Sequence, residues 1–282
     1  MKRFLTELKY DGMAPTSIMF YKDVGHSQEG AKEVTKLLNA GVFDGPKPVR
    51  LLTRLLTLAN LKDDSLVLDF FSGSATTAHA IMQMNADKGS HIKYVMVQLP
   101  EVCDGKGTAY KAGYKTICEI GKERIRRAGK KIKEDSPLTT QGLDTGFRVL
   151  KCDTSNMKEV YYNPAEYEAS LFSSLEDNIK EDRTPEDLLF QVMLDLGILL
   201  SSKIQVRSEK VGMRSYSYFD VEDGYLIACF DKNIDEEVIT AIAKQKPYYF
   251  VMRDSSMAND SVATNFDQIF ATYSPDTVRK VL

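Results

Sequence analysis

The segment LVLDFFSGSATTAHAIM, residues 66–82, has the residue types and spacing of a cofactor-binding turn. Its first part predicts a strand over residues 66–70 that contains Asp69, and its last part predicts a helix over residues 76–84. Gly73, between the two, permits a positive φ or a close backbone approach. In a parallel α/β sheet such a turn lies at the carboxyl end of a strand, where ligands bind.

The chemistry of this turn favours a cofactor with an amino acid group. The glycines of GxGxxG are absent apart from Gly73, and GxxxxGK[ST] is absent too, so no phosphate cradle is expected. The Asp69 carboxylate would attract an ammonium group and repel a phosphate. S-adenosylmethionine meets this description. A strand-to-helix turn can also carry glycine and serine for geometry alone, so the turn by itself leaves both interpretations open.

The elements around the turn are typical of βαβ units. Pro48 suits the first turn of a helix, and VRLLTRLLTLANL after it has a broad apolar face. A second strand is predicted over residues 92–98 and a basic helix from about residue 116 onward. This alternation predicts a parallel sheet. Upstream, the pattern predicts a strand over residues 17–21 and a helix over residues 28–38.

The second half of the chain reads as a separate α/β or α+β domain. Residues 136–142 resemble a linker, and a short strand is predicted over residues 147–152. Thr184 and Asp187 are spaced like a capping box for a helix that begins at Pro185. That helix is expected to run through an apolar segment, residues 188–200, which is either core or a dimer surface. Strands are then predicted at residues 203–207, 215–220, 225–230 and 247–252, with helices at 235–244 and 265–272.

Composition excludes several classes of protein. A formal net charge of −3 argues against a protein wrapped wholly around nucleic acid. The four cysteines are widely spaced and there are only three histidines, so we expect free thiols and no metal site. No apolar run approaches the ~20 residues that span a bilayer, so no membrane association is expected. These features favour a cytoplasmic location.

Several motifs resemble known methyltransferases. LDFFSGSATTAHA resembles the cofactor motif of β-class amino-methyltransferases, and Gly-Pro-Lys-Pro-Val with the helix after it resembles the second cofactor motif of that class. More narrowly, the chain resembles the modification subunit of type III restriction–modification systems. The segments that carry this likeness are KYVMVQLPE, GYKTICEIGKERIRRAGKKI, DTGFRVLKCDTSNMKEV, LLFQVMLDLGILL and VMRDSSMANDSVATNFDQIF.

The resemblance implies a fold, an activity and a cofactor site. The fold would be part of a Rossmann-like sheet that binds S-adenosylmethionine (residues 46–135), after a remnant of the preceding region (residues 1–45) and before a smaller C-terminal domain (residues 144–282). The activity would be methyl transfer to the amino group of adenine in DNA. The residues implied to contact the cofactor are Lys47, Pro48, Asp69, Phe70, Phe71, Gly73, Ser74 and Gln98.

One residue departs from the family pattern in this site. Ala75 stands where the family usually has a second glycine, which gives GSA in place of GSG. If this position requires φ > 0, Ala75 adds strain of ~1 kcal/mol or more. This strain is expected to affect the affinity for the cofactor.

The catalytic motif of the family has no counterpart in this sequence. Relatives use Asp-Pro-Pro-Tyr to hold the flipped adenine, whereas this chain has nine prolines and no Pro-Pro. The nearest imitation, Asn163-Pro164-Ala165-Glu166-Tyr167, lies after the cofactor motif and is interpreted as a turn. We therefore expect no catalytic residue in this chain. The chain is expected to be the C-terminal part of a modification subunit (an expressed fragment, a truncated gene or half of a split enzyme) and inactive alone.

Partners are implied by the resemblance and by one basic helix. The implied partners are DNA, a second modification subunit and a restriction subunit. The helix over residues 122–133 carries basic residues that either contact phosphate or form a solvated face. Two other functions stay open: an interaction module without chemistry, and a nucleotide-dependent oxidoreductase, which the missing phosphate cradle disfavours. The candidate DNA contacts are Arg124, Arg126, Arg127, Lys130 and Lys131.

Overall fold

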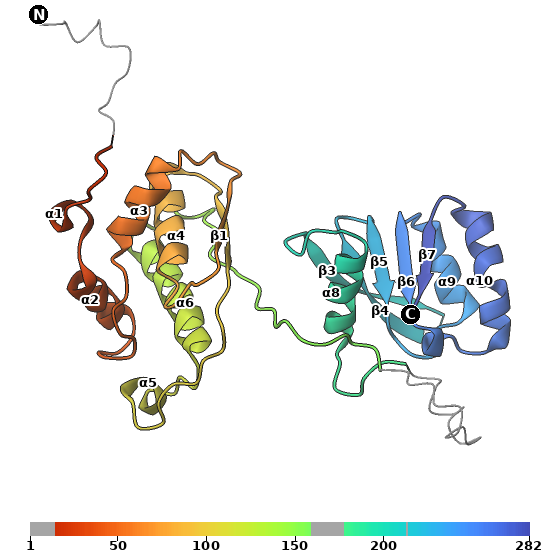
Figure 1. Ribbon diagram of the computed structural model, residues 1–282. Helices are drawn as coiled ribbons and strands as arrows, with labels where there is room; N and C mark the ends of the chain where they lie inside the picture. The colour runs from red at the N-terminus through yellow and green to blue at the C-terminus, as the bar shows by residue number, and fades with distance from the viewer. Residues whose placement is uncertain (1–14, 159–177, 213) are drawn as a thin grey trace, which may run out of the picture. The chain divides into compact units, whose positions relative to one another are not determined.

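A computed structural model describes residues 15–158, 178–212 and 214–282 of the chain. These residues belong to two compact units, Met1–Leu150 and Lys151–Leu282 (Figure 1). The first unit contains the predicted cofactor turn, and the second contains a larger sheet. Both units mix helices with strands, so the predicted α/β class is confirmed.

The first unit is built around a two-stranded parallel sheet. Strand β1 (Leu66–Asp69) pairs with β2 (Lys93–Met96), with Leu66 opposite Lys93 and Asp69 opposite Met96. Helix α4 (Thr76–Lys88) connects the two strands, which gives the predicted βαβ unit. The other helices of this unit are α1 (Tyr21–Val24), α2 (Ser27–Leu37), α3 (Val49–Leu58), α5 (Thr108–Lys111) and α6 (Ile117–Asp135).

The two faces of this small sheet differ in burial. On one face, Val67 and Tyr94 pack against the helices, in a cluster with Ile81 and Met84 of α4. On the other face, Leu66 and Leu68 are 64% and 59% exposed. Parallel sheets are normally covered on both faces. Among the described residues, this face has no covering layer.

Helix α6 packs against the predicted cofactor turn on its interior side. It begins at a capping box, in which the Glu119 carboxylate accepts a hydrogen bond from the backbone N–H of Thr116 at 3.3 Å. Its buried side packs against α2 and α4. A Cβ atom on Gly121 would lie 3.3 Å from the carbonyl oxygen of Gly73 and 3.6 Å from the Cβ of Ala75. The helix backbone therefore lies directly against the turn.

The second unit is a five-stranded mixed sheet with strand order β3-β4-β5-β6-β7 (Figure 1). The first three strands are antiparallel neighbours, and the last three are parallel neighbours. Crossover helices join the parallel strands, as the loop lengths of parallel pairs require. The elements are α8 (Pro185–Asp195), β3 (Ile204–Val211), β4 (Arg214–Val221), β5 (Leu226–Cys229), α9 (Glu236–Lys244), β6 (Tyr249–Met252), the 3-10 turn η3 (Asp254–Ser256), α10 (Asp260–Tyr273) and β7 (Val278–Val281).

Alternate residues of the central strands bury two separate cores. Ile227 and Cys229 of β5 join a cluster with helices α9 and α10. Leu226 and Ala228 of the same strand join a cluster with α8. All four residues of β5 are buried, as expected for a strand covered on both faces.

Two strands predicted from the sequence are wrong. Residues 17–20 form no strand, and Tyr21 begins the short helix α1; Ile18 is 63% exposed, so the apolar run does not face a core. Residues 147–152 are also outside any strand, and Val149 is 53% exposed. An extended apolar run becomes a strand only where a neighbouring strand pairs with it, and no short pattern encodes that neighbour.

Two helix boundaries and one strand in the second unit also differ from the prediction. Helix α8 stops at Asp195, because Gly197 with φ +69° ends it in a left-handed conformation. Helix α10 starts earlier than predicted, at Asp260, where the side chain of Asn259 caps it by accepting from the N–H of Val262. The closing strand β7 was missed, since its four residues alternate only weakly.

Candidate cofactor site

The predicted cofactor turn lies at the carboxyl end of β1 and is tied to the end of β2. The N–H of Val97 donates to the carbonyl of Asp69 at 2.8 Å, and the N–H of Ser72 donates to the carbonyl of Val97 at 3.1 Å. The N–H of Ala75 closes the turn onto the carbonyl of Ser72 at 2.7 Å. The geometry therefore places the turn at the edge of a parallel sheet where ligands bind.

Asp69 is fixed by two hydrogen bonds within this turn. One carboxylate oxygen accepts from the hydroxyl of Thr77 at 2.5 Å, and the other accepts from the N–H of Phe71 at 3.2 Å. An ionised carboxylate has about four acceptor positions, so both oxygens retain capacity for a ligand. Thr77 was not among the predicted site residues; its position as the second residue of α4, next to the turn, was the available signal.

The exposed side of the turn is aromatic. Phe70 and Phe71 are 63% and 76% exposed, with their ring centroids 5.2 Å apart. Gly73 has φ +51°, and a Cβ atom there would lie 3.2 Å from the ring of Phe43. The predicted need for glycine at position 73 is confirmed on conformational grounds.

Ala75 adopts the left-handed conformation, with φ 59° and ψ 41°. It is also buried, and it is the residue that immediately precedes α4. The condition on which strain was predicted at this position is therefore met. A residue with a Cβ pays about 1 kcal/mol or more in this region.

Replacing Ala75 with glycine is expected to raise the free energy of unfolding of the first unit by about 1 kcal/mol, because glycine removes the left-handed strain. The matched control is Ala78→Gly inside helix α4, where glycine costs about 1 kcal/mol. Urea unfolding curves of the three proteins measure both effects. A stability loss in Ala75→Gly equal to that in Ala78→Gly would show that position 75 is unstrained.

The Gly45-Pro46-Lys47-Pro48 segment is held by helix α2. A Cβ atom on Gly30 would lie 2.2 Å from the carbonyl oxygen of Pro46, so the two backbones are in direct contact. Pro48 is buried and immediately precedes α3, whereas Lys47 is exposed. Of the two predicted contacts in this segment, only Lys47 presents its side chain outward. A glycine inside a helical pattern was the signal for this contact.

Gln98 has a structural role in addition to the ligand contact that the resemblance implies. Its side-chain carbonyl accepts from the N–H of Gly73 at 2.8 Å, which ties the end of β2 to the turn. The amide nitrogen of Gln98 makes a longer contact of 3.4 Å to the carbonyl of Leu99. The amide N–H₂ group is therefore the part with capacity left for a ligand hydroxyl.

Ser74 and Arg124 correct two expectations from the sequence. The hydroxyl of Ser74 is buried and accepts from the Arg124 guanidinium at 2.8 Å, so it faces the protein interior. Arg124 is 0% exposed, and burial lowers the pKa of its side chain to about 10. A buried guanidinium has no access to DNA phosphate, so Arg124 leaves the set of candidate DNA contacts. Its phase with Ile120 and Ala128, on the apolar side of α6, was the signal.

The other four basic residues of the set are exposed on α6 and paired with nearby acids. Arg126 and Arg127 lie 3.6 Å and 2.6 Å from the carboxylate of Glu123. Lys130 and Lys131 pair one turn ahead, with Glu134 at 3.7 Å and Asp135 at 2.9 Å. These i,i+3 and i,i+4 pairs offset much of the positive charge.

His79 is a largely buried residue of α4. Burial lowers the pKa of its imidazole to about 4, and the nearby Arg124 cation adds to that effect. The ring is therefore neutral at pH 7. Its folded-state pKa is depressed, so its contribution to stability is present above the unfolded pKa near 6.5 and is lost as the pH falls through about 4.

Replacing His79 with glutamine is therefore expected to flatten part of the acid sensitivity of the first unit. Between pH 7 and pH 4, the free energy of unfolding of wild type should fall by about 2 kcal/mol more than that of His79→Gln, since the neutral amide takes up no proton. Matched urea titrations at both pH values measure this. The control is the same replacement at an exposed histidine, His91→Gln; His91 pairs with Asp63 at 3.2 Å. Equal losses in wild type and His79→Gln would contradict the assignment.

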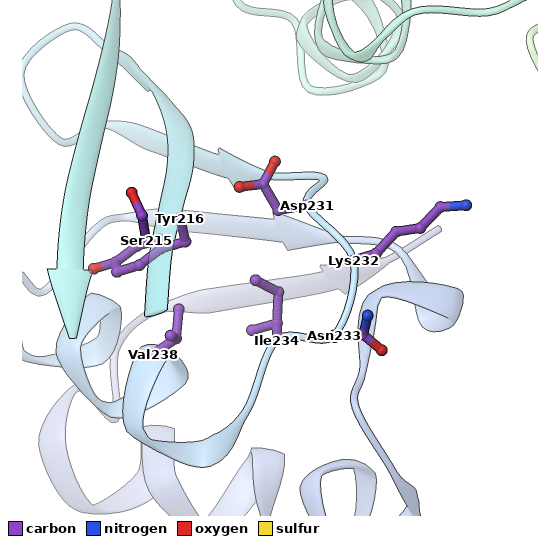
Figure 2. Close-up of a pocket in the computed structure, with 7 residues that line it drawn as sticks. All are labelled: Ser215, Tyr216, Asp231, Lys232, Asn233, Ile234 and Val238. Carbon is purple, nitrogen blue, oxygen red and sulfur yellow. The ribbon is translucent and has the colours of Figure 1, made fainter. Parts of the chain in front are cut away.

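The second unit has a cavity of about 310 Å³ beside the carboxyl end of β5 (Figure 2). Asp231 accepts from the N–H of Ser217 at 2.7 Å, and Lys232 extends away from the other lining side chains. The lining residues are Ser215, Tyr216, Asp231, Lys232, Asn233, Ile234 and Val238.

The Asn163–Tyr167 imitation of the catalytic motif lies outside the described residues.

All four cysteines are free, as the sequence predicted. Within the described ranges, no group of three or more His, Cys, Asp or Glu side chains is placed to hold a metal ion. The same ranges contain no helix that is long and apolar enough to span a membrane.

The sequence of the first unit matches a known family. Residues 13–130 match the family described as DNA methylase, and this range contains the turn, the Gly-Pro-Lys-Pro segment and most of α6. The StyLTI Mod subunit of a type III restriction–modification enzyme from Salmonella typhimurium is 40% identical over 129 residues, and the EcoPI Mod subunit from Escherichia phage P1 is 38% identical over 136.

These relatives confirm the resemblance to type III modification subunits. The match covers 46% of this chain and 19% of the StyLTI subunit, and 48% of this chain and 20% of the EcoPI subunit. The type II methyltransferase M.KpnI of Klebsiella pneumoniae is 32% identical over 100 residues, which cover 36% of this chain and 24% of that relative. The matched region thus spans about a fifth of the length of the curated type III relatives.

Proposed function

We propose that the DNA methylase region binds S-adenosylmethionine at the turn over residues 69–73. The observation that carries this proposal is the Asp69 carboxylate, held at a strand end beside exposed aromatic rings with acceptor capacity left for an ammonium group. Lys47 and the Gln98 amide would contact the remaining parts of the ligand. When bound, S-adenosylmethionine supplies an activated methyl group; these residues bind and orient the ligand.

The sheet of the first unit is proposed to be part of a Rossmann-like methyltransferase sheet. Leu66, Leu68 and Val95 leave an apolar face uncovered, and the strands β1 and β2 pair with each other alone among the described residues. Further strands and helices of a methyltransferase domain would cover this face and extend the edges. Residues 46–135 would then be the cofactor part of that domain, and residues 144–282 the C-terminal domain.

We propose that the complete protein methylates adenine in DNA as part of a type III system. Its partners would be DNA, a second modification subunit and a restriction subunit. The chain contains no Pro-Pro, and hence no Asp-Pro-Pro-Tyr to present a flipped base. The 282-residue chain is therefore proposed to bind the methyl donor without transferring the methyl group.

A methyl-transfer assay tests this division of labour. Purified chain with tritiated S-adenosylmethionine and adenine-containing DNA should transfer no label, while a full-length relative such as the EcoPI Mod subunit serves as the positive control. Label transferred to adenine by the chain alone would contradict the proposed dependence on groups outside it.

The basic face of α6 is proposed as a DNA contact in the complete protein, now without Arg124. For the chain itself, the Lys130→Glu and Lys131→Glu pair should reduce the slope of log affinity against log salt by about 2, since two phosphate contacts are lost. Fluorescence anisotropy with duplex DNA over a salt series measures the slope. The Lys244→Glu and Lys246→Glu pair, in the second unit, carries the same charge change as a control. An unchanged slope in the α6 pair would mean that these lysines are only a solvated face.

The interaction-module alternative has one observation in its favour. Within residues 188–200, most apolar side chains are core, but Leu194 and Leu199 are 64% and 72% exposed. An exposed leucine pair would suit a contact with another subunit. In this alternative the turn is only scaffold, and the chain binds no S-adenosylmethionine at millimolar concentration.

A further inference from the structure

Arg124 is a fully buried cation that lies against the cofactor turn. Its Nη1 atom donates to the hydroxyl of Ser74 at 2.8 Å and to the hydroxyl of Thr76 at 2.7 Å. These two residues flank Ala75, the left-handed position. The next residue, Thr77, donates its hydroxyl to Asp69. Arg124 therefore bonds to Thr76, the residue next to Thr77, and the Thr77 hydroxyl holds the Asp69 carboxylate in place.

Glu33 connects Arg124 to the other wall of the candidate site. One of its carboxylate oxygens accepts from the N–H of Val49 at 2.9 Å and lies 3.9 Å from Nη2 of Arg124. Val49 is the first residue of α3 and follows Pro48 directly. Burial raises the pKa of Glu33, while the Val49 N–H and the Arg124 cation favour its ionised form. A polar path therefore runs from the turn through Arg124 and Glu33 to the Gly-Pro-Lys-Pro segment.

Stability alone does not account for an arginine at this position. A buried ion pair is often no more stable than apolar side chains of similar volume, because both charges lose their hydration. Here Nε and Nη2 of Arg124 have no hydrogen-bond partner in the described part of the chain, so desolvation is only partly offset. A pKa of about 10 still leaves the guanidinium charged at neutral pH. The benefit of Arg124 is therefore the geometry that its hydrogen bonds give to Ser74 and Thr76.

We infer that Arg124 is a positioning residue for methyl-donor binding, which holds the Ser74–Thr76 turn in its left-handed form and, through Glu33, fixes that turn relative to residues 45–48. The inference rests on the proposed function. Arg124 contacts no ligand itself. It acts through Thr77 and Asp69 on one side of the site and through Val49 on the other.

Four variants of the full chain test this role. Arg124→Met removes the charge and the donors but keeps an unbranched apolar side chain in place of the arginine's aliphatic stem, and Arg124→Lys restores one cationic donor. Glu33→Gln keeps an acceptor for Val49 but removes the partner charge. Lys133→Met, on the same helix, is the control for loss of a cation. Each protein is titrated calorimetrically with S-adenosylmethionine, melted, and followed by amide hydrogen exchange without ligand.

Arg124→Met should bind S-adenosylmethionine about tenfold or more weakly, while its melting temperature shifts by no more than about 4 °C. Arg124→Lys should recover part of the affinity, and Glu33→Gln should lose a smaller factor than Arg124→Met. In Arg124→Met, amides of residues 72–77 and of Val49 should exchange faster even without ligand. Lys133→Met should match wild type in all three measurements.

The outcomes separate this inference from the proposed function. If wild type binds and Arg124→Met binds equally well, the positioning role is overturned while the proposed function stands. If wild type itself does not bind, both fail. If affinity and melting temperature fall together in Arg124→Met, with no recovery in Arg124→Lys, Arg124 is a packing residue only. If Arg124→Met does not fold, the other two variants decide. Wild-type affinity for S-adenosylmethionine in both Arg124→Lys and Glu33→Gln then overturns the inference.

Discussion

Replacing Gly30 with alanine is expected to lower the free energy of unfolding of the first unit by about 3 kcal/mol. The added methyl group would lie 2.2 Å from the carbonyl oxygen of Pro46 and 2.8 Å from the carbonyl carbon of Lys47. Both are backbone atoms on a segment held by α2 and α3, so neither moves away cheaply. Helix α2 must shift away from the Gly-Pro-Lys-Pro segment, which would also displace Glu33 from Val49.

Urea unfolding followed by hydrogen exchange at residues 27–58 measures this effect. Gly142→Ala is the matched control, because nothing lies within 4 Å of the added Cβ atom in the same unit. That control should change stability by less than about 0.5 kcal/mol. Equal stabilities for Gly30→Ala and Gly142→Ala would show that α2 does not pack on residues 46 and 47 as described.

Replacing Phe250 with alanine is expected to cost the second unit about 3–5 kcal/mol. Phe250 is fully buried on β6, with parallel neighbours on both sides of its strand. Its ring centroid lies 5.2 Å from that of Phe270 and 6.0 Å from that of Phe266, both on α10. Truncation removes the aromatic contacts and leaves a cavity between the sheet and α10, and both effects destabilise.

The measurement for Phe250 is the unfolding free energy reported by hydrogen exchange at β5, β6 and α10. Leu194→Ala is the control in the same unit, since Leu194 is 64% exposed and its truncation should change stability by less than about 0.5 kcal/mol. Protection that stays at the wild-type value in Phe250→Ala would contradict the arrangement of this core.

The local features of the site could be predicted from the sequence because they depend on near neighbours. The strand before Asp69, the helix after Ala75 and the positive φ at Gly73 all follow from residue types within a dozen positions. The parallel pairing of β1 and β2 followed from the strand–helix–strand order. Strain at Ala75 could also be predicted, on the condition that φ is positive there, and the structure has φ 59° at this residue.

The contacts across the unit could not be predicted because they join residues far apart in the chain. Arg124 and Ser74 are 50 positions apart, and only tertiary packing turns a basic residue of α6 into a buried donor. The same holds for Gly30 and Pro46, whose backbones meet through the packing of α2. Strand β7 was missed because its place beside β6, with Phe250 opposite Arg279, is set by the sheet and not by its own four residues.

Calorimetric titration of S-adenosylmethionine into the chain and its Asp69→Asn variant tests the central claim most directly. Asparagine keeps a hydrogen-bonding group for Phe71 and Thr77 but removes the charge that would attract the ligand's ammonium group. Wild type is predicted to bind both S-adenosylmethionine and its demethylated product, and Asp69→Asn to bind both at least about tenfold more weakly. No binding by wild type at millimolar ligand, or equal affinity in Asp69→Asn, would contradict a methyl-donor site at this turn.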